Sequence, residues 1–150
     1  MAQTTGAISF KDVKWEYSLD GGSTWKDGSG YMNNIKIKGF TRNTGEYYTA
    51  AGDTPILKRG KRKPGTVTVE AAYTETTGEP WYDFDSAYRN STDVMIRWSP
   101  KGGNSTNKRF TSDAGIVSEP VHPVGDVEKG DIVKINCQIE CTEITPSTIP

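Results

Sequence analysis

The stretch 133–142 reads VKINCQIECT and alternates apolar and polar side chains without a break. Side chains two residues apart lie on the same face of a β-strand. One face would hold Val133, Ile135, Cys137, Ile139 and Cys141, and the other Lys134, Asn136, Gln138, Glu140 and Thr142. A strand that buries one face only is typical of an antiparallel sheet, so this stretch predicts such a strand.

The same period of two recurs earlier in the chain. The segments are residues 13–19, 35–38, 67–73 and 94–98. In the first of them we expect Trp15 and Tyr17 to lie inside and Lys14, Glu16 and Ser18 to face solvent. The pattern predicts a mainly β protein, an antiparallel β-sandwich or barrel, folded as a single domain over residues 1–150.

One segment, EPWYDFDSAYRNS at 79–91, breaks this alternation. Trp81, Phe84 and Tyr88 recur at the spacing of a helix face. Pro80 suits the first helical position, and Asn90 can end the helix. We therefore expect one short helix that packs on a sheet through Trp81, Phe84 and Tyr88.

The segment from about residue 41 to 65 is polar and contains four glycines and two prolines. A connection of this length in a small domain is commonly functional, so we expect a long hairpin arm that binds a partner. Its returning half carries Lys58, Arg59, Lys61, Arg62 and Lys63. From the residues alone, three interpretations stay open: a protein partner, a nucleic acid or a solvated loop. No aromatic residue interrupts the basic run to stack on bases, which favours a protein.

The last residues, about 145–150, are expected to be extended or frayed.

Charge is unevenly distributed along the chain. The net charge is −1, but without the five basic residues of the arm 13 basic residues stand against 19 acidic ones, a net charge of −6. A basic arm on an acidic body favours self-association over a general nucleic-acid surface. The low hydrophobic content, 33%, and the mean hydropathy of −0.65 fit an assembly subunit with much surface.

No constellation for catalysis or for a metal or cofactor stands out, so we predict neither an enzyme nor a bound cofactor. The N-terminal residues lack the pattern of a signal peptide, and no apolar run is long enough to span a membrane. Cys137 and Cys141 in one strand would have Cα atoms about 13 Å apart, beyond disulfide reach. Asp83 and Asp85 point in different directions on the helix, and His122 lies in a connector.

The octapeptide SLDGGSTW at 18–25 matches the Asp-box of sialidase-like propellers, but the chain holds one copy and propellers need one per blade. We interpret it as a hairpin turn at Asp20–Gly22. The tryptophans leave open a second class, a monomeric β-sandwich module that binds a carbohydrate or a protein. Trp15 and Trp98 fall on apolar strand faces, so Trp25 is the candidate platform for stacking on a sugar.

Four segments in order carry a family resemblance: GTVTVEAAYTE, PWYDFDSAYRN, DVMIRW and FTSDAGIVSEPVHPVGDVEKGDIVKINCQIE. Over roughly residues 30–145 the chain resembles the tail tube (major tail) proteins of long-tailed bacteriophages. The resemblance implies a β-sandwich with one flanking helix and a structural role in the virion. Six copies would form a ring whose sheets join around a channel, and stacked rings would form the tube through which the genome leaves.

The resemblance also implies partners and a location. The partners would be further copies of the chain, the tape measure, tip and terminator proteins, and DNA in passage, but no membrane. The protein would be made in the host cytoplasm and reside in the virion tail, with a non-contractile tail expected and a contractile one left open. The arm would dock on an acidic patch of a neighbouring subunit or ring. The channel lining should be mainly polar or acidic, with Glu70, Lys134, Gln138 and Glu140 as candidate lining residues.

Overall fold

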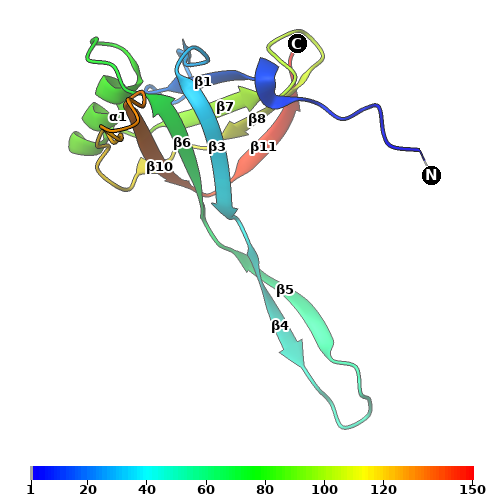
Figure 1. The fold of residues 1–150 in the computed structure, drawn as a ribbon. Helices are drawn as coiled ribbons and strands as arrows, with labels where there is room; N and C mark the ends of the chain where they lie inside the picture. Colours follow the sequence, from blue (N-terminus) through cyan, green and yellow to red (C-terminus); the bar gives the residue numbers. More distant parts are fainter. Residues whose placement is uncertain (1) are drawn as a thin grey trace.

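The computed structural model describes residues 2–150. Met1, the first residue of the domain expected over 1–150, lies outside the described residues. Two antiparallel sheets and a helix enclose one core, and a long two-stranded hairpin projects from one sheet (Figure 1). The protein is therefore mainly β and sandwich-like, with one α-helix in the described part, as the alternation predicted.

The two sheets draw their strands from distant parts of the chain. The five-stranded sheet has the order β11 (Ile144–Thr148), β8 (Lys108–Ser112), β7 (Met95–Ser99), β1 (Lys14–Ser18) and β2 (Lys26–Asp27). The four-stranded sheet has the order β3 (Met32–Gly39), β6 (Gly65–Ala72), β10 (Lys134–Cys141) and β9 (Ile116–Val117). The hairpin consists of β4 (Arg42–Tyr47) and β5 (Ile56–Arg62). The helical segments are a 3-10 turn at Phe10–Asp12 and α1 (Pro80–Arg89).

Strand β10 lies inside the four-stranded sheet and confirms the alternation from which it was predicted. It pairs with β6 along its whole length, from Lys134 opposite Ala72 to Cys141 opposite Gly65. Its apolar side chains are buried and its polar ones face away from the core. The strand begins one residue later than the alternation does, because Val133 precedes it and is 41% exposed.

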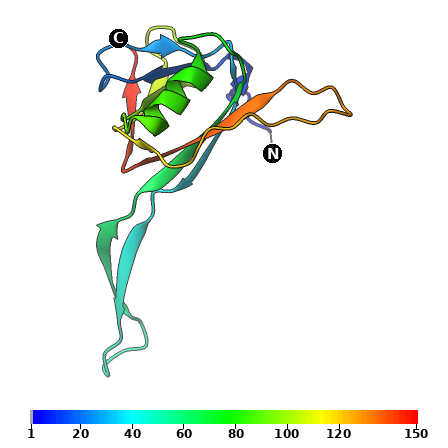
Figure 2. The ribbon, with the colours of Figure 1, turned by 90° about the vertical axis from the view of Figure 1, so that its left-hand side faces the viewer.

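The core lies between the two sheets, and α1 closes one side of it (Figure 2). Trp15 and Tyr17 of β1 pack against Phe84 of α1, with ring centroids 6.2 Å and 5.0 Å apart. All three side chains are almost completely buried. The four-stranded sheet contributes Val67, Val69, Ala71, Ile135, Cys137, Ile139 and Cys141. Burial of these side chains, worth about 1.5–3 kcal/mol for each large aliphatic or aromatic group, is the main term that stabilises the domain.

Strand β1 departs from the expected pattern, because Glu16 and Ser18 are buried as well as Trp15 and Tyr17. Arg97 of the adjacent strand covers Glu16 and donates from Nε to its carboxylate at 2.7 Å. Ser18 is covered by the turn that follows it. The expectation of a solvated face was wrong here because polar partners, which the alternation cannot reveal, bury these two side chains.

Helix α1 has the predicted bounds, with Pro80 at its start and Asn90 as its C-cap. Its buried side chains are Pro80, Phe84 and Ala87. Tyr88 was expected on the packing face but is 38% exposed. At 3.6 residues per turn Trp81 and Tyr88 lie along the flank of the buried stripe and not at its centre. Trp81 is partly buried and donates from its indole N–H to the Val121 carbonyl at 2.9 Å.

The C-terminal residues form an edge strand. Strand β11 pairs with β8 from Ile144 opposite Ser112 to Thr148 opposite Lys108. Pro146 fits there because an edge strand has a backbone side that needs no donor. Within residues 2–150 no helix combines the length and the apolar composition needed to cross a membrane.

Candidate functional site

The outward face of the four-stranded sheet is polar over three neighbouring strands. Strands β3, β6 and β10 are in register, so their outward side chains form rows across the sheet. The rows are Asn34–Glu70–Asn136, Lys36–Thr68–Gln138 and Lys38–Thr66–Glu140, and Lys134 lies opposite Ala72 at the end. The four residues predicted to line a channel, Glu70, Lys134, Gln138 and Glu140, therefore share this face, which we call the polar face.

The polar face carries mixed charge and is not acidic. Its ionic side chains are Lys36, Lys38 and Lys134 against Glu70 and Glu140. Glu70 lies 3.7 Å from the Lys134 ammonium and accepts a hydrogen bond from the Asn33 side chain at 2.8 Å. The face is thus polar without being acidic, because lysines from β3 offset the glutamates.

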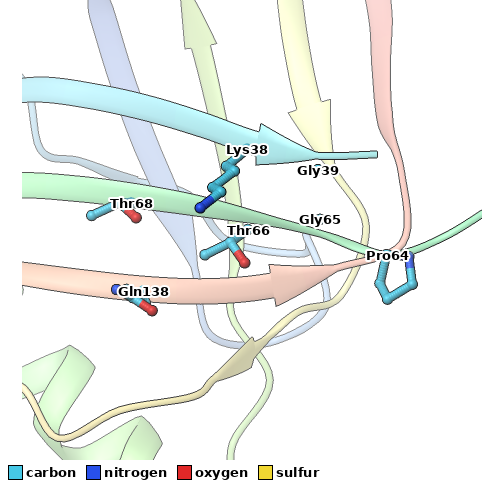
Figure 3. A pocket seen from close by; sticks show the side chains of 7 residues that line it. All are labelled: Lys38, Gly39, Pro64, Gly65, Thr66, Thr68 and Gln138. Atoms are coloured by element: carbon cyan, nitrogen blue, oxygen red, sulfur yellow. The ribbon is translucent and has the colours of Figure 1, made fainter. Parts of the chain in front are cut away.

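The polar face is hollowed next to the base of the hairpin. Figure 3 shows the side chains of Lys38, Thr66, Thr68 and Gln138 around this hollow, which has a volume of about 410 Å³. Hydroxyl, amide and ammonium groups from three strands surround it, together with Gly39, Pro64 and Gly65. These polar groups keep the hollow hydrated.

The hairpin, residues 40–64, leaves the sheet at a glycine pair. Gly39 and Gly65 lie opposite each other, and a Cβ on Gly39 would come within 2.9 Å of the Gly65 Cα. The chain turns away through Gly39 and Phe40, which have φ angles of +90° and +58°. Gly65 leaves room for the Phe40 ring, which a Cβ there would meet at 2.3 Å. Phe40 packs on the core and so fixes the point at which the hairpin departs.

The hairpin is a regular β-ladder that carries exposed apolar side chains. It pairs from Arg42 opposite Arg62 to Tyr47 opposite Ile56, with one irregularity between Arg42 and Thr44. The exposed fractions are 69% for Tyr47, 62% for Tyr48, 48% for Ile56 and 62% for Leu57. A two-stranded hairpin without a packed face is marginally stable in water, and its exposed apolar side chains make it a candidate docking surface.

The predicted basic run lies on β5 and just after it. Lys58, Arg59, Lys61, Arg62 and Lys63 are all exposed. Arg62 forms an ion pair with Glu143 at 3.0 Å, which joins the hairpin to the β10–β11 turn. Within residues 2–150 the other four have no carboxylate at ion-pair distance. The structure thus gathers the basic residues on the projecting element and leaves most of their charge unpaired.

The Asp-box-like segment forms the turn of the β1–β2 hairpin. Asp20 accepts the backbone N–H of Thr24 at 2.9 Å and the hydroxyl of Ser18 at 2.8 Å. These bonds hold the pKa of the Asp20 carboxyl at about 2. Gly21 and Gly22 adopt φ angles of +74° and +91°, which glycine reaches without strain. The segment is a structural turn, as interpreted from its single copy.

The candidate sugar platform is covered on one face. The Arg97 guanidinium lies 4.1 Å from the ring centroid of Trp25. Arg97 is in turn paired with Glu16. Burial opposes ionisation of Glu16, but hydrogen bonds and ion pairs with Lys14 and Arg97 hold its pKa below the ordinary value. Trp15 and Trp98 are buried in the core, as predicted.

The remaining candidates for chemistry serve the structure. Asp83 accepts the Tyr17 hydroxyl and lies 2.9 Å from the Lys26 ammonium, which fastens α1 to the five-stranded sheet. Asp85 pairs with Arg89 one helical turn later at 2.9 Å. Cys137 and Cys141 are free and buried, and burial raises the pKa of their thiols to about 12 and about 11. His122 is exposed in the connector before β10.

A second projection was not predicted from the sequence. Residues 124–133 form a loop that closes on a bridge between Val124 and Lys134, and Figure 2 shows it in orange extending from the domain. We call it the β9–β10 loop. The run GDVEKGD at 125–131 is the sequence signal for it, because glycines and charged residues are typical of exposed turns. Val127 and Ile132 are 98% and 78% exposed on this loop.

No family model and no curated protein matches this sequence. Solved structures do match it in fold. A chain of the PVC sheath–tube complex, an extracellular contractile injection system in its extended state, superposes with a TM-score of 0.72 at 13% identity, covering 97% of this chain and 95% of that one. The SPP1 tail tube matches with a TM-score of 0.68 at 12% identity, covering 95% and 80%.

A third match comes from the tail of an empty gene transfer agent particle with C6 symmetry. Its TM-score is 0.60 at 10% identity, with 99% of this chain and 100% of that chain covered. These likenesses extend over 95–99% of this chain. The protein has the fold of tail tube proteins, which confirms the resemblance in the sequence.

Proposed function

We propose that this protein is a structural subunit of a bacteriophage tail tube. Copies would assemble into rings, and stacked rings would form a channel for passage of the genome. The observation that carries the proposal is the likeness in fold to tail tube proteins over 95–99% of this chain. A ring of six copies fits the C6 symmetry of the gene transfer agent tail.

The polar face supports a role as channel lining. Its rows of asparagine, threonine, glutamine and charged side chains keep the surface hydrated. Three lysines and two glutamates give it a local net charge of only +1. DNA binds proteins mainly through phosphate contacts with many basic side chains. A nearly balanced lining would therefore let DNA slide through without holding it. Glu70, Lys134, Gln138 and Glu140 remain the proposed lining residues.

The edges of the four-stranded sheet support lateral assembly. Strand β3 is one edge, and the two-residue strand β9 covers only part of β10 at the other. Unpaired backbone groups at such edges form hydrogen bonds with another strand when one is offered. Ile37 of β3 is 50% exposed and would be covered by the neighbour. Joined in this way, the sheets of successive copies would continue around the ring.

The hairpin would serve as the contact arm between copies. Its exposed apolar side chains and basic run are the features of a surface that is covered in an assembly. The proposed role is structural and involves no catalysis. Other tail proteins, namely the tape measure, tip and terminator proteins, would be its further partners. The protein would be made in the host cytoplasm and reside in the virion tail.

Negative-stain electron microscopy of the purified protein over a concentration series tests the proposal. The expected result is hollow tubes or stacked rings above a threshold concentration, because weak repeated contacts polymerise cooperatively. Single particles at every concentration, with and without an added tail-tip or terminator protein as nucleus, would contradict it.

A further inference from the structure

The hairpin and the β9–β10 loop project from opposite ends of the same sheet. The hairpin leaves where Gly65 of β6 lies opposite Cys141 of β10. The loop enters β10 at the other end, where Lys134 lies opposite Ala72. Strands β6 and β10 run antiparallel between these two points over their full length (Figures 1 and 2). Within one copy, therefore, the two projections are held apart by the length of the sheet.

The β9–β10 loop is acidic. It carries three negative side chains and one positive side chain, all exposed, namely Asp126, Glu128, Asp131 and Lys129. Asp126 accepts the backbone N–H of Glu128 at 3.0 Å, which shapes the turn. Within the described part of the chain none of these three carboxylates has an ion-pair partner. The loop therefore presents negative charge where the hairpin presents positive charge.

The loop also presents apolar surface beside a hollow. Val127 is 98% exposed, and the hollow between the loop and the end of β6 has a volume of about 590 Å³. Tyr73 and Glu75 line its far side, and Val124, Asp126 and Val133 line the loop side. The loop thus has apolar groups next to unpaired carboxylates. The hairpin has apolar groups, Tyr47 and Leu57, next to unpaired basic groups, so the two surfaces are complementary.

We propose that the hairpin of one copy docks on the β9–β10 loop of the next copy along the tube. Lys58, Arg59 and Lys61 would face Asp126, Glu128 and Asp131, and Leu57 would lie near Val127. The contact joins unlike surfaces at opposite ends of one sheet, so it is heterologous and repeats without closing. Such a contact stacks rings, whereas the strand edges close each ring. The inference rests on the proposed function and names the receptor of the arm.

The acidic loop argues for a second copy over a nucleic acid as the occupant. A phosphate backbone would be repelled by three unpaired carboxylates, whereas a basic hairpin would be attracted to them. The hairpin by itself could attract either partner. The loop at the far end of the same sheet has charge and apolar surface that complement both features of the hairpin.

Reciprocal charge reversal tests the pairing in the full-length protein. The hairpin variant is Lys58→Glu, Arg59→Glu and Lys61→Glu, and the loop variant is Asp126→Lys, Glu128→Lys and Asp131→Lys. Each alone should raise the threshold concentration for tubes by at least about tenfold, because like charges then face each other. A variant that carries both sets of substitutions should assemble at a threshold concentration close to that of the wild type. The matched control reverses three exposed basic residues elsewhere, Lys11, Lys101 and Lys108, and should change the threshold little.

Cross-linking gives a second readout that does not depend on charge. Leu57→Cys mixed with Val127→Cys should give a disulfide-linked pair of chains under mild oxidation. The native Cys137 and Cys141 are buried and do not compete. Ile8→Cys, also exposed, mixed with Leu57→Cys is the control and should give no such pair. Circular dichroism and the melting temperature verify that every variant is folded.

The outcomes separate this inference from the proposed function. Wild-type tubes together with reversal variants that assemble normally and cysteines that do not cross-link would overturn the docking and leave the tube function standing. A wild-type protein that stays monomeric, together with Leu57→Cys and Val127→Cys variants that do not cross-link, would overturn both. If the loop variant assembles at the wild-type threshold and the hairpin variant loses binding to DNA, the docking is overturned in favour of a nucleic-acid partner.

Discussion

The Arg62 guanidinium lies 3.0 Å from the Glu143 carboxylate and ties the base of the hairpin to the β10–β11 turn. That turn is itself held by Asp113, which accepts the backbone N–H groups of Thr142 and Glu143 at 3.0 Å and 3.1 Å. Burial opposes ionisation of Asp113, but these bonds and the Thr142 hydroxyl hold its pKa below the ordinary value. The direction of the hairpin is therefore linked to a rigid part of the body.

Replacing Glu143 with Gln should loosen the hairpin without unfolding the domain. Both partners of the ion pair are more than half exposed, so its contribution to the unfolding free energy is about 0–1 kcal/mol. We expect faster hydrogen exchange at the hairpin amides and an almost unchanged melting temperature. Glu140→Gln is the control, because Glu140 forms no ion pair within the described residues. Equal exchange rates in the two variants would show that the ion pair does not hold the hairpin.

Replacing Gly28 with Ala should destabilise the core. A Cβ on Gly28 would lie 1.8 Å from a ring carbon of Trp15, which is completely buried. Relieving such a clash costs about 1–3 kcal/mol or more, because a packed ring has little room to shift. Gly30→Ala is the matched control, since nothing lies within 4 Å of its Cβ position. Urea unfolding measures both, and equal midpoints would contradict the packing described here.

Acid should weaken the domain partly through Asp20. Its pKa is about 2 in the folded protein, against about 3.8 when unfolded, because Thr24 and Ser18 donate to the carboxylate. A lowered pKa gives stability that is present above the unfolded value and is lost as the pH falls from about 4 to about 2. Asp20→Asn should therefore show a smaller loss of stability over this interval. Urea unfolding midpoints at several pH values measure this loss of stability. The control is Asp53→Asn, in the segment that connects β4 to β5.

The same pKa can be measured directly. Carboxyl chemical shifts followed by NMR should show Asp20 titrating well below the ordinary aspartate range. An ordinary titration midpoint would mean that the turn bonds do not form in solution.

Neutralising the basic run should impair polymerisation and leave the subunit folded. The five residues lie on the projecting hairpin and are exposed, so their replacement by Ser removes charge without opening the core. The changed residues are Lys58, Arg59, Lys61, Arg62 and Lys63. Light scattering measures the polymerisation threshold. A control that replaces Lys11, Arg89, Lys101 and Lys108 by Ser removes four positive charges outside the hairpin and should polymerise normally. Unchanged polymerisation of the hairpin variant would count against its role as a contact arm.

Strict alternation made much of the fold predictable. Strand β10 could be located because each of its apolar positions meets the core and each polar one faces away. Pro80 and Asn90 gave the bounds of α1 for the same local reason. The burial of Glu16 could not be predicted, because it depends on Arg97, 81 residues later in the sequence.

The candidate site was predictable in its parts but not in its arrangement. The sequence gives the polar positions of β10, but only the register with β3 and β6 places Lys36, Thr68 and Gln138 in one row. The basic run could be recognised in the sequence from its composition alone. The acidic loop that we propose as its counterpart was missed because the β9–β10 loop projects from the far end of the sheet, and topology, not local sequence, determines that position.

A cryo-EM reconstruction of the polymer formed by the wild-type protein tests the central claim most directly. The account predicts a hollow tube of stacked rings in which the polar face, with Glu70, Lys134, Gln138 and Glu140, lines the channel. It also predicts that every hairpin contacts another copy. A polymer whose channel is lined by another surface, with the polar face turned outward to solvent, would contradict it.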